Sequence, residues 1–141
     1  MNEIETLLPH REPFLFVDEI IETSKEKIIA KHVFTNNEFF FKGHFPEYPV
    51  VPGVILVETM AQSGGAGLRK LGILGGGALF FLATIDSVKF RRQVRPGDEV
   101  RCEIENLRIS ERMIKQQGKA YVGDELAAEA QWMCLVDNQE K

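Results

Sequence analysis

From Gly53 to about Arg69 the chain is apolar in nearly every direction around a helical axis. Pro52 falls where a first helical position is expected, because its missing N–H costs nothing there. A helix that is apolar on most faces is buried on most sides rather than lying on a surface. We therefore expect the other segments to wrap around this helix. The residues that cover its faces are Val54, Ile55, Leu56, Val57, Met60, Ala61 and Leu68.

Two polar residues of this helix are conspicuous because the helix is predicted to be buried. Glu58 and Gln62 are four positions apart and share one face. A carboxylate in an apolar interior is costly unless it is paired or used in function, which makes Glu58 a candidate functional residue. The alternative is a structural ion pair with an arginine such as Arg91. Small residues at positions 63–67 let a sheet or a second helix pack very close.

His44 lies just upstream, beside a loop that its prolines keep from being helical (residues 46–52). Three consecutive phenylalanines at 39–41 precede it; they cannot all face one core, so some should line a cavity or meet another subunit. An apolar cavity holding His44 and Glu58 would contain a base and an acid. The alternative for His44 is a loop histidine bonded to the backbone. Unpaired N–H groups at Gly53, where the helix begins, would be ready to bind a carbonyl oxygen that gains negative charge.

Other residues that could carry chemistry are assigned structural roles. The segment at residues 61–65 resembles a nucleophile elbow, but its Ser63 lies inside the predicted helix and no histidine follows it, so Ser63 is predicted to be a packing residue. His10 is expected to organise a turn between two prolines, and His32 to lie on a strand surface. The glycines match no nucleotide-binding motif.

The remaining segments predict an antiparallel sheet. Val100, Cys102 and Ile104 alternate with polar residues, and the apolar phase then shifts, which predicts a bulge near Asn106. Gly123 opens a two-residue hairpin turn. We expect a short helical turn at residues 3–8 and strands at residues 13–22, 27–34, 78–90 with a bend at Asp86, from Glu99 onward, 113–122 and 125–136. Two strands, one helix and about four more strands give an α+β fold.

Composition narrows the function classes. The 141 residues predict a single domain over residues 1–141. The net charge of −4 without a run of like charges argues against nucleic acid as the main partner. Cys102 and Cys134 lack a nearby ligand motif and are interpreted as buried thiols, with no metal site. The acidic N-terminus and the lack of an apolar run of about 20 residues predict a soluble cytoplasmic protein without a membrane segment.

Three blocks of this sequence resemble the β-hydroxyacyl-acyl carrier protein dehydratases of bacterial fatty acid synthesis. LLPHREPFLFVDEI at residues 7–20 resembles the N-terminal signature of that family. GHFPEYPVVPGVILVETMAQ at residues 43–62 resembles its highly specific active-site signature, and residues 81–100 resemble its third block. Thr59 stands where the family often has Ala, and Gln93 where Pro is common. The resemblance covers most of the chain.

The resemblance implies a hot-dog fold, in which a long central helix is wrapped by a curved antiparallel sheet. It also implies a homodimer with continuous sheets, commonly a trimer of dimers, and an active site at the dimer interface. His44 matches the catalytic base, and Glu58, contributed by the other subunit, matches the acid. The activity implied is dehydration of (3R)-3-hydroxyacyl-acyl carrier protein to the trans-2-enoyl product, without a cofactor and with acyl carrier protein as partner.

Further residues are assigned to the substrate. The predicted substrate-binding residues are Gly53, Val54, Gln62, Phe41, Phe45 and Phe81. The candidates for an apolar tunnel that holds the acyl chain are Phe39, Phe40, Phe41, Phe80, Phe81 and Leu82. A basic group of Arg91, Arg92 and Arg95 is predicted to dock the acidic carrier protein, with a purely structural role as the alternative.

Three other functions remain open from the sequence. A sibling dehydratase that also isomerises the double bond characteristically has Asp at the acid position, where this chain has Glu58. A thioesterase on the same fold would release free thiol, and usually lacks the block from His44 to Glu58. A non-catalytic module would bind the acyl carrier without turning it over.

Overall fold

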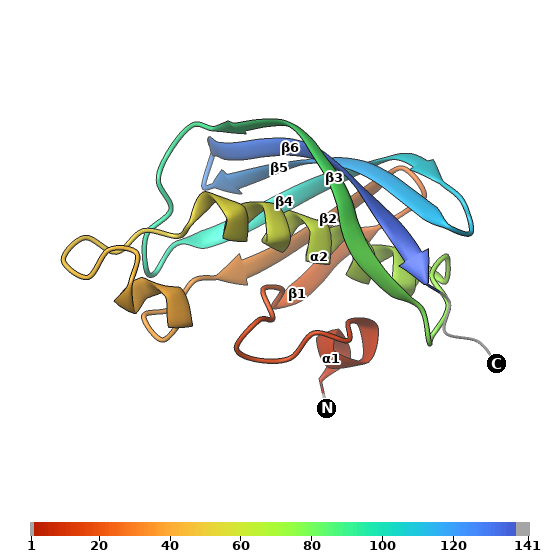
Figure 1. Cartoon of the computed structure of the whole chain (residues 1–141), viewed down its shortest axis with the longest axis horizontal. Helices are drawn as coiled ribbons and strands as arrows, with labels where there is room; N and C mark the ends of the chain where they lie inside the picture. Colours follow the sequence, from red (N-terminus) through yellow and green to blue (C-terminus); the bar gives the residue numbers. More distant parts are fainter. Residues whose placement is uncertain (1, 138–141) are drawn as a thin grey trace.

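A computed structural model describes residues 2–137 of the chain. A helix of 19 residues, α2 (Gly53–Leu71), lies in the hollow of a curved six-stranded sheet (Figure 1). All strand pairs are antiparallel and the spatial order is β1-β2-β4-β5-β6-β3. This is the predicted hot-dog arrangement. The other elements are α1 (Glu3–Leu7), β1 (Glu19–Thr23), β2 (Lys27–Val33), the 3₁₀ helix η1 (Phe39–Lys42), β3 (Leu79–Phe90), β4 (Glu99–Ile109), β5 (Met113–Val122) and β6 (Glu125–Asp137).

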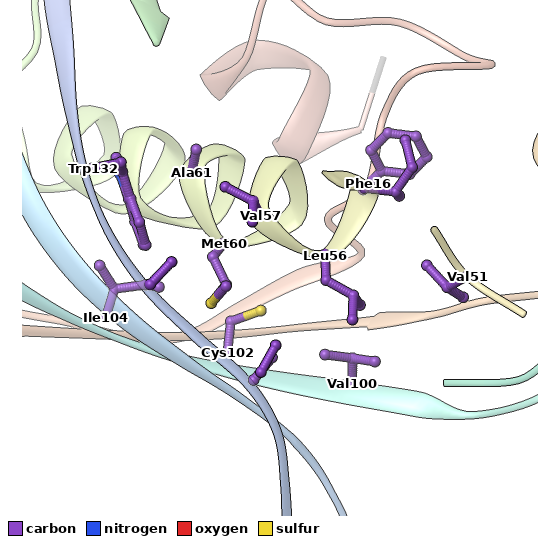
Figure 2. Close-up of a cluster of buried hydrophobic side chains, with 14 of the residues drawn as sticks. Phe16, Val51, Leu56, Val57, Met60, Ala61, Val100, Cys102, Ile104 and Trp132 are labelled. Atoms are coloured by element: carbon purple, nitrogen blue, oxygen red, sulfur yellow. The ribbon is translucent and has the colours of Figure 1, made fainter. Parts of the chain in front are cut away.

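The burial of α2 follows from its apolar surface, as predicted. Every residue of α2 from Ile55 to Leu68 except Glu58 is buried. Side chains of α2 such as Met60 pack against Cys102 and Ile104 of β4 and against Trp132 of β6 (Figure 2). Burying one large apolar side chain of this kind contributes about 1.5–3 kcal/mol to folding. Among the apolar residues predicted to cover the faces of the helix, Val54 is the exception, with 74% of its surface exposed.

Two boundaries differ from the sequence prediction. The strand predicted over residues 13–22 begins only at Glu19, because the backbone N–H of Phe16 and the carbonyl of Phe14 bond to the side chain of Gln62 instead of a neighbouring strand. Pro52 is the N-cap of α2 rather than its first helical residue. The 3₁₀ helix η1 has no counterpart in the prediction.

Two irregular points of the sheet agree with the sequence, whereas three further register shifts, at Ile20/Glu22, Leu82/Thr84 and Ala120/Tyr121, were not predicted. The register of β4 against β5 shifts between Asn106 and Arg108, which is the predicted bulge. β3 shifts against β6 between Asp86 and Lys89, where a bend was expected. Gly123 takes a positive φ of 60° in the hairpin that joins β5 to β6. At each predicted point the local sequence carried enough information to predict the change.

Both cysteines are buried free thiols, as predicted. Burial raises the pKa of Cys102 and that of Cys134 to about 12, so both remain protonated at neutral pH. Within residues 2–137, no three His, Cys, Asp or Glu side chains are grouped as a metal site would require. In the same part of the chain, no helix combines the length and the hydropathy that crossing a bilayer demands.

The surroundings of Gly118 in β5 show how tightly the core is packed. A Cβ atom at this position would lie 2.6 Å from the ring of Trp132, which is 1% exposed, and 2.8 Å from Ile104. Overpacking a filled core costs about 1–3 kcal/mol. We expect Gly118→Ala to lower the free energy of unfolding by about that amount in urea denaturation. Gly75→Ala is the matched control, because nothing lies within 4 Å of a Cβ at Gly75. Equal stability of the two variants would contradict this account.

Candidate active site

Glu58 lies at the wall of a pocket of about 310 Å³. Its side chain is 20% exposed. Burial raises the pKa of this carboxyl group, and the hydrogen bond from Gln62 opposes that rise only in part. The other residues that line the pocket are His10, Ala61, Phe80, Phe81, Leu82 and Cys134. An acid in these mostly apolar surroundings is favoured in its protonated form, which can give a proton to a substrate.

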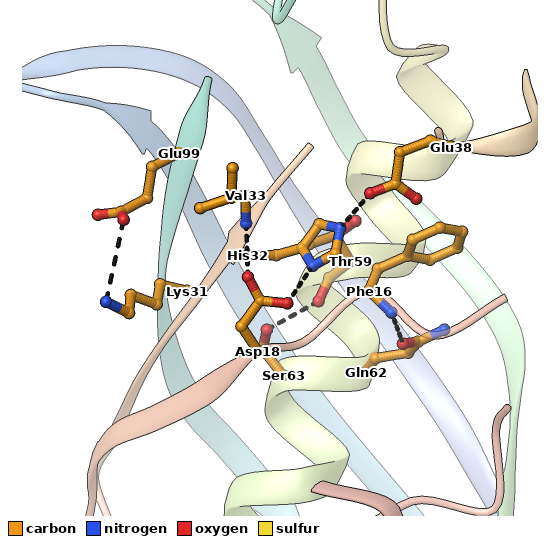
Figure 3. Close-up of polar contacts among 10 residues, drawn as sticks. All are labelled: Phe16, Asp18, Lys31, His32, Val33, Glu38, Thr59, Gln62, Ser63 and Glu99. Atoms are coloured by element: carbon orange, nitrogen blue, oxygen red, sulfur yellow. Dashed lines mark hydrogen bonds and ion pairs between the residues drawn. The ribbon is translucent and has the colours of Figure 1, made fainter. Parts of the chain in front are cut away.

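Gln62 ties Glu58 to the N-terminal segment. Its Nε2 donates to Oε2 of Glu58 at 3.0 Å and to the carbonyl of Phe14 at 3.1 Å. Its Oε1 accepts from the backbone N–H of Phe16 at 2.8 Å (Figure 3). The amide is completely buried, so its orientation is set by these three bonds. Through this direct contact Gln62 can orient the carboxyl group of Glu58.

His10 is the residue at this site that the sequence prediction missed. Its Nε2 lies 3.6 Å from Oε2 of Glu58, and its ring centroid is 5.9 Å from that of Phe80. Burial lowers the pKa of His10, and the positive charge of Arg11 lowers it further. The histidine assigned to a turn thus shares a pocket with the candidate acid. No local pattern could have revealed this, because 48 positions separate the two residues.

His44 lies outside this pocket, in the loop between η1 and α2. The loop projects from one end of the molecule (Figure 1). The Nδ1 atom of His44 lies 3.1 Å from the carbonyl oxygen of Val50, and its ring stacks on Phe45 at 4.4 Å. Because a carbonyl accepts, Nδ1 carries the proton, which leaves Nε2 as a free acceptor. One chain therefore does not bring His44 into the pocket of Glu58.

The start of α2 forms a second, separate hollow. Gly53 and Val54 line it together with Phe90 and Val94. The N-cap, Pro52, has no side chain that could accept a hydrogen bond from the first turn. The first N–H groups of a helix have no acceptor within the helix. Ile55 and Leu56 donate their N–H groups to the carbonyl of Pro52, which leaves the N–H groups of Gly53 and Val54 for an incoming oxygen.

The predicted tunnel residues separate into three groups. Phe80, Phe81 and Leu82 line the pocket of Glu58. Phe40 and Phe41 are buried in the main core instead, with exposed fractions of 8% and 6%. Phe39 is 48% exposed, so the three consecutive phenylalanines do face different surroundings. Phe45 is 54% exposed beside His44.

The three arginines of the predicted docking group all have partners within the chain. Arg91 pairs with Glu129 at 2.7 Å, so the alternative in which it pairs with Glu58 is wrong. Arg92 pairs with Glu125 at 3.0 Å. Arg95 donates to the carbonyl of Pro49 and lies over the ring of Tyr48 at 3.9 Å, while the hydroxyl of Tyr48 donates to Gln93. These contacts favour the structural alternative, and the docking role remains a prediction.

His32 was predicted to lie on a strand surface, and this prediction is wrong. The residue is buried, with 5% of its surface exposed. Its two ring nitrogens each lie 2.8 Å from a carboxylate, Nδ1 from Asp18 and Nε2 from Glu38 (Figure 3). Asp18 also accepts from the backbone N–H of Val33. Burial alone would lower the pKa of His32, but the two hydrogen bonds outweigh it and raise the pKa to about 9.

Ser63 has the packing role that was predicted. Its hydroxyl group donates to the carbonyl of Thr59 within α2 at 2.8 Å, and its residue is 1% exposed. Thr59 likewise donates to the carbonyl of Ile55. Both hydroxyl groups are therefore satisfied inside the helix and neither faces a pocket of Glu58 or His44.

Comparison with known proteins gives a consistent result over the chain. A family model described as a FabA-like domain matches residues 8–131. A 3-hydroxyacyl-acyl-carrier-protein dehydratase FabZ of Desulforamulus reducens is 47% identical over 96% of this chain and 96% of its own length. The same enzyme of Pelotomaculum thermopropionicum is 46% identical over 96% of this chain and 97% of its own length.

Solved structures show the fold alone, because their sequence identity is low. A dehydratase heterocomplex, ApeI:P, from Xenorhabdus doucetiae has a TM-score of 0.82 at 16% identity, covering 99% of this chain and 93% of that one. A thioesterase from Haemophilus influenzae has a TM-score of 0.61 at 17% identity, covering 87% and 80%. One fold therefore carries more than one kind of reaction.

Proposed function

The chain belongs to the family of FabZ 3-hydroxyacyl-acyl-carrier-protein dehydratases, and we propose that His44 of one copy and Glu58 of another carry out its dehydration. The observation that carries this assignment is the pocket of Glu58. It holds a partly buried acid whose pKa is raised, yet the only imidazole among its lining residues is that of His10. A base from outside the chain would complete it.

His44 fits the role of the base better than His10 does. The Nδ1 atom of His44 faces a carbonyl, so its Nε2 is free to accept a proton. The Nδ1 atom of His10 is buried without a hydrogen-bond partner. Placing a proton there would bury an unpaired donor, so His10 carries its proton on Nε2 and has no accessible acceptor. Its lowered pKa also makes His10 a weaker base than an ordinary histidine.

We propose a homodimer formed along β3. This strand is an edge of the sheet, so the backbone N–H and C=O groups along its outer side have no neighbouring strand. Its large apolar side chains are exposed: Phe81 by 54%, Ile85 by 46% and Phe90 by 53%. Pairing two such edges would make the two sheets continuous and cover these side chains. Phe81 also lines the pocket of Glu58, so this edge lies beside the acid. Assembly of three dimers is proposed from the family resemblance.

The reaction follows from these groups. Nε2 of His44 removes a proton from the α-carbon of a 3-hydroxyacyl thioester, and the electron pair of that C–H bond becomes the new double bond. The hydroxyl group leaves the β-carbon with the proton of Glu58, as water. A positioned proton transfer of this kind is worth about 10²- to 10⁴-fold. The free N–H of Gly53 would meet the charge on the thioester oxygen, worth roughly 3–4 kcal/mol. No cofactor takes part in the proposed reaction.

The substrate would be carried by acyl carrier protein in the cytoplasm, as in fatty acid elongation. Phe80, Phe81 and Leu82 would contact the acyl chain, since they form the apolar side of the pocket. Val54 and Phe45, exposed by 74% and 54%, are placed to contact the thioester end or the second subunit.

The test is the product formed from a 3-hydroxyacyl thioester of acyl carrier protein. We expect the trans-2-enoyl thioester, with the thioester bond intact and the double bond unshifted. Release of free thiol would point to a thioesterase instead, and a shifted double bond to an isomerase. Binding without any product, unchanged by His44→Ala, would contradict a catalytic role.

A further inference from the structure

The two donors near Glu58 approach the same oxygen. Gln62 donates to Oε2 at 3.0 Å, and Nε2 of His10 lies 3.6 Å from that same atom. The second distance is slightly longer than a hydrogen bond, and contacts of this kind commonly tighten when substrate binds. An oxygen that accepts from N–H groups is a poor place for the proton of the acid. Since both contacts are to Oε2, the proton of Glu58 is expected on Oε1.

The surroundings of His10 determine which of its ring nitrogens carries the proton. Nδ1 of His10 is buried and has no hydrogen-bond partner. An unpaired N–H group at this atom would cost more free energy than an unpaired lone pair. The neutral ring thus carries its proton on Nε2, the atom that faces Glu58. An imidazolium would place a proton on both nitrogens, which is disfavoured for the same reason. His10 therefore acts toward Glu58 as an uncharged donor.

The backbone around His10 is held in place by its neighbour. The guanidinium group of Arg11 donates to the carbonyl of His10 at 2.7 Å, to that of Leu8 at 2.8 Å and to that of Glu5 at 3.1 Å. The side chain of His10 in turn rests against Phe80 of β3. A loop residue fixed on both its backbone and its ring can define the position of a second group.

We propose that His10 is a positioning residue for Glu58, whose Nε2–H, together with Gln62, holds Oε2 as an acceptor so that Oε1 delivers the proton. This rests on the proposed role of Glu58 as the acid. It gives the N-terminal segment a part in the reaction, because the segment carries His10 and also fixes Gln62 through Phe14 and Phe16. His10 itself does not touch the reacting atoms.

In the described part of the chain, residues 2–137, few other ionisable groups act on this pair. Cys134 lines the same pocket, and burial together with the charge of Glu58 keeps it protonated by raising its pKa. Arg11 acts on His10 from the loop. Because His10 itself titrates, a change in the pH dependence of catalysis on replacing it is assigned to Glu58 where the titration of the Glu58 carboxyl group moves with it.

The experiment compares His10→Phe, which keeps an aromatic ring but removes the donor, with His10→Gln, whose amide nitrogen can replace Nε2. Glu12→Gln is the control, because Glu12 is an exposed residue of the same loop. The rate of dehydration is measured across pH, together with the infrared carbonyl band of protonated Glu58, assigned by its loss in Glu58→Gln. Melting temperature and oligomeric state are recorded for every variant.

We expect His10→Phe to lower kcat about tenfold with KM changed less than about twofold. Loss of a donor to the carboxylate favours the neutral acid, so the alkaline limb of the profile and the infrared titration should both move to higher pH. His10→Gln should restore most of the rate and move both back. A profile unchanged in His10→Phe, or equal losses in both variants, would overturn the proposal.

The variant Glu58→Gln separates this proposal from the assignment of the acid. If Glu58→Gln is inactive and His10→Phe behaves as wild type, only the positioning role of His10 fails. If Glu58→Gln keeps wild-type activity, Glu58 is not the acid, and both the active-site assignment and the role of His10 fail.

Discussion

Mixing His44→Ala protein with Glu58→Ala protein should return activity that neither variant has alone. Each single variant is expected to lose about 10²- to 10⁴-fold in kcat, because it lacks one partner of the proton transfers. If each site takes His44 from one subunit and Glu58 from another, a mixed dimer contains one site with both groups intact. Random exchange would then restore about a quarter of wild-type activity, since about half of the dimers are mixed and each has one intact site.

The result depends on subunit exchange, which is followed by mass spectrometry of differently tagged proteins. The matched control mixes His44→Ala with His44→Ala carrying the second tag, which cannot rebuild a site. Confirmed exchange without recovered activity would show that the two groups do not act across subunits. High activity of His44→Ala by itself would instead make His10 the base, since His10 already lies beside Glu58 in one chain.

Replacing His32 by glutamine should make the folded state less stable, and mainly below neutral pH. The pKa of His32 is raised from 6.5 to about 9 by its bonds to Asp18 and Glu38, against the effect of burial. A raised pKa contributes stability that is complete below the pKa of the unfolded chain and is lost as pH rises through the folded value. The shift corresponds to roughly 3 kcal/mol, present near pH 6 and gone above about pH 9.

The measurement is the free energy of unfolding of wild type minus that of His32→Gln, followed from about pH 6 to about pH 10 by urea denaturation. The difference should shrink by roughly 3 kcal/mol across that range. Asp18→Asn removes one of the two partners and lowers the folded pKa of His32, so the decline in this variant should be smaller and should end at lower pH. Parallel stability curves for wild type and His32→Gln would contradict the imidazolium assignment.

The same contact connects stability to the loop that carries His44. Glu38 directly precedes η1, and η1 leads to the loop residues from His44 onward. Its carboxylate is held by His32 of β2. Loss of this ion pair at high pH should therefore loosen η1 before it affects α2, which is packed on most sides.

Much of the fold was predictable because its patterns are local. The period of α2, the alternation of β4 and the turn at Gly123 each depend on neighbouring residues, and each agrees with the structure. The irregular run at residues 13–18 was wrongly predicted as a strand. Its apolar composition resembles a strand, but its backbone groups bond to Gln62, which lies 46 positions from Phe16. The extent of the domain, residues 1–141, stays a prediction.

The candidate site was predictable only in its parts. Glu58 and His44 were identified as polar groups in apolar surroundings, and their joint action remains a proposal. His10 and His32 were assigned wrongly or incompletely, because their neighbours, Glu58 and Asp18 with Glu38, come from other elements. A chain with no companion copy also leaves His44 away from its proposed acid.

The sequence by itself determined where helix and strands form, since hydrophobic periodicity and turn residues act over a few positions. It also determined that a carboxyl group would lie on the helix that the sheet wraps around. Only the tertiary structure decided which imidazole lies beside that carboxyl group, which one is held between two carboxylates, and which edge of the sheet stays open. Desolvation and charge pairing depend on groups brought together from distant parts of the chain. A local sequence pattern does not show which distant groups come into contact.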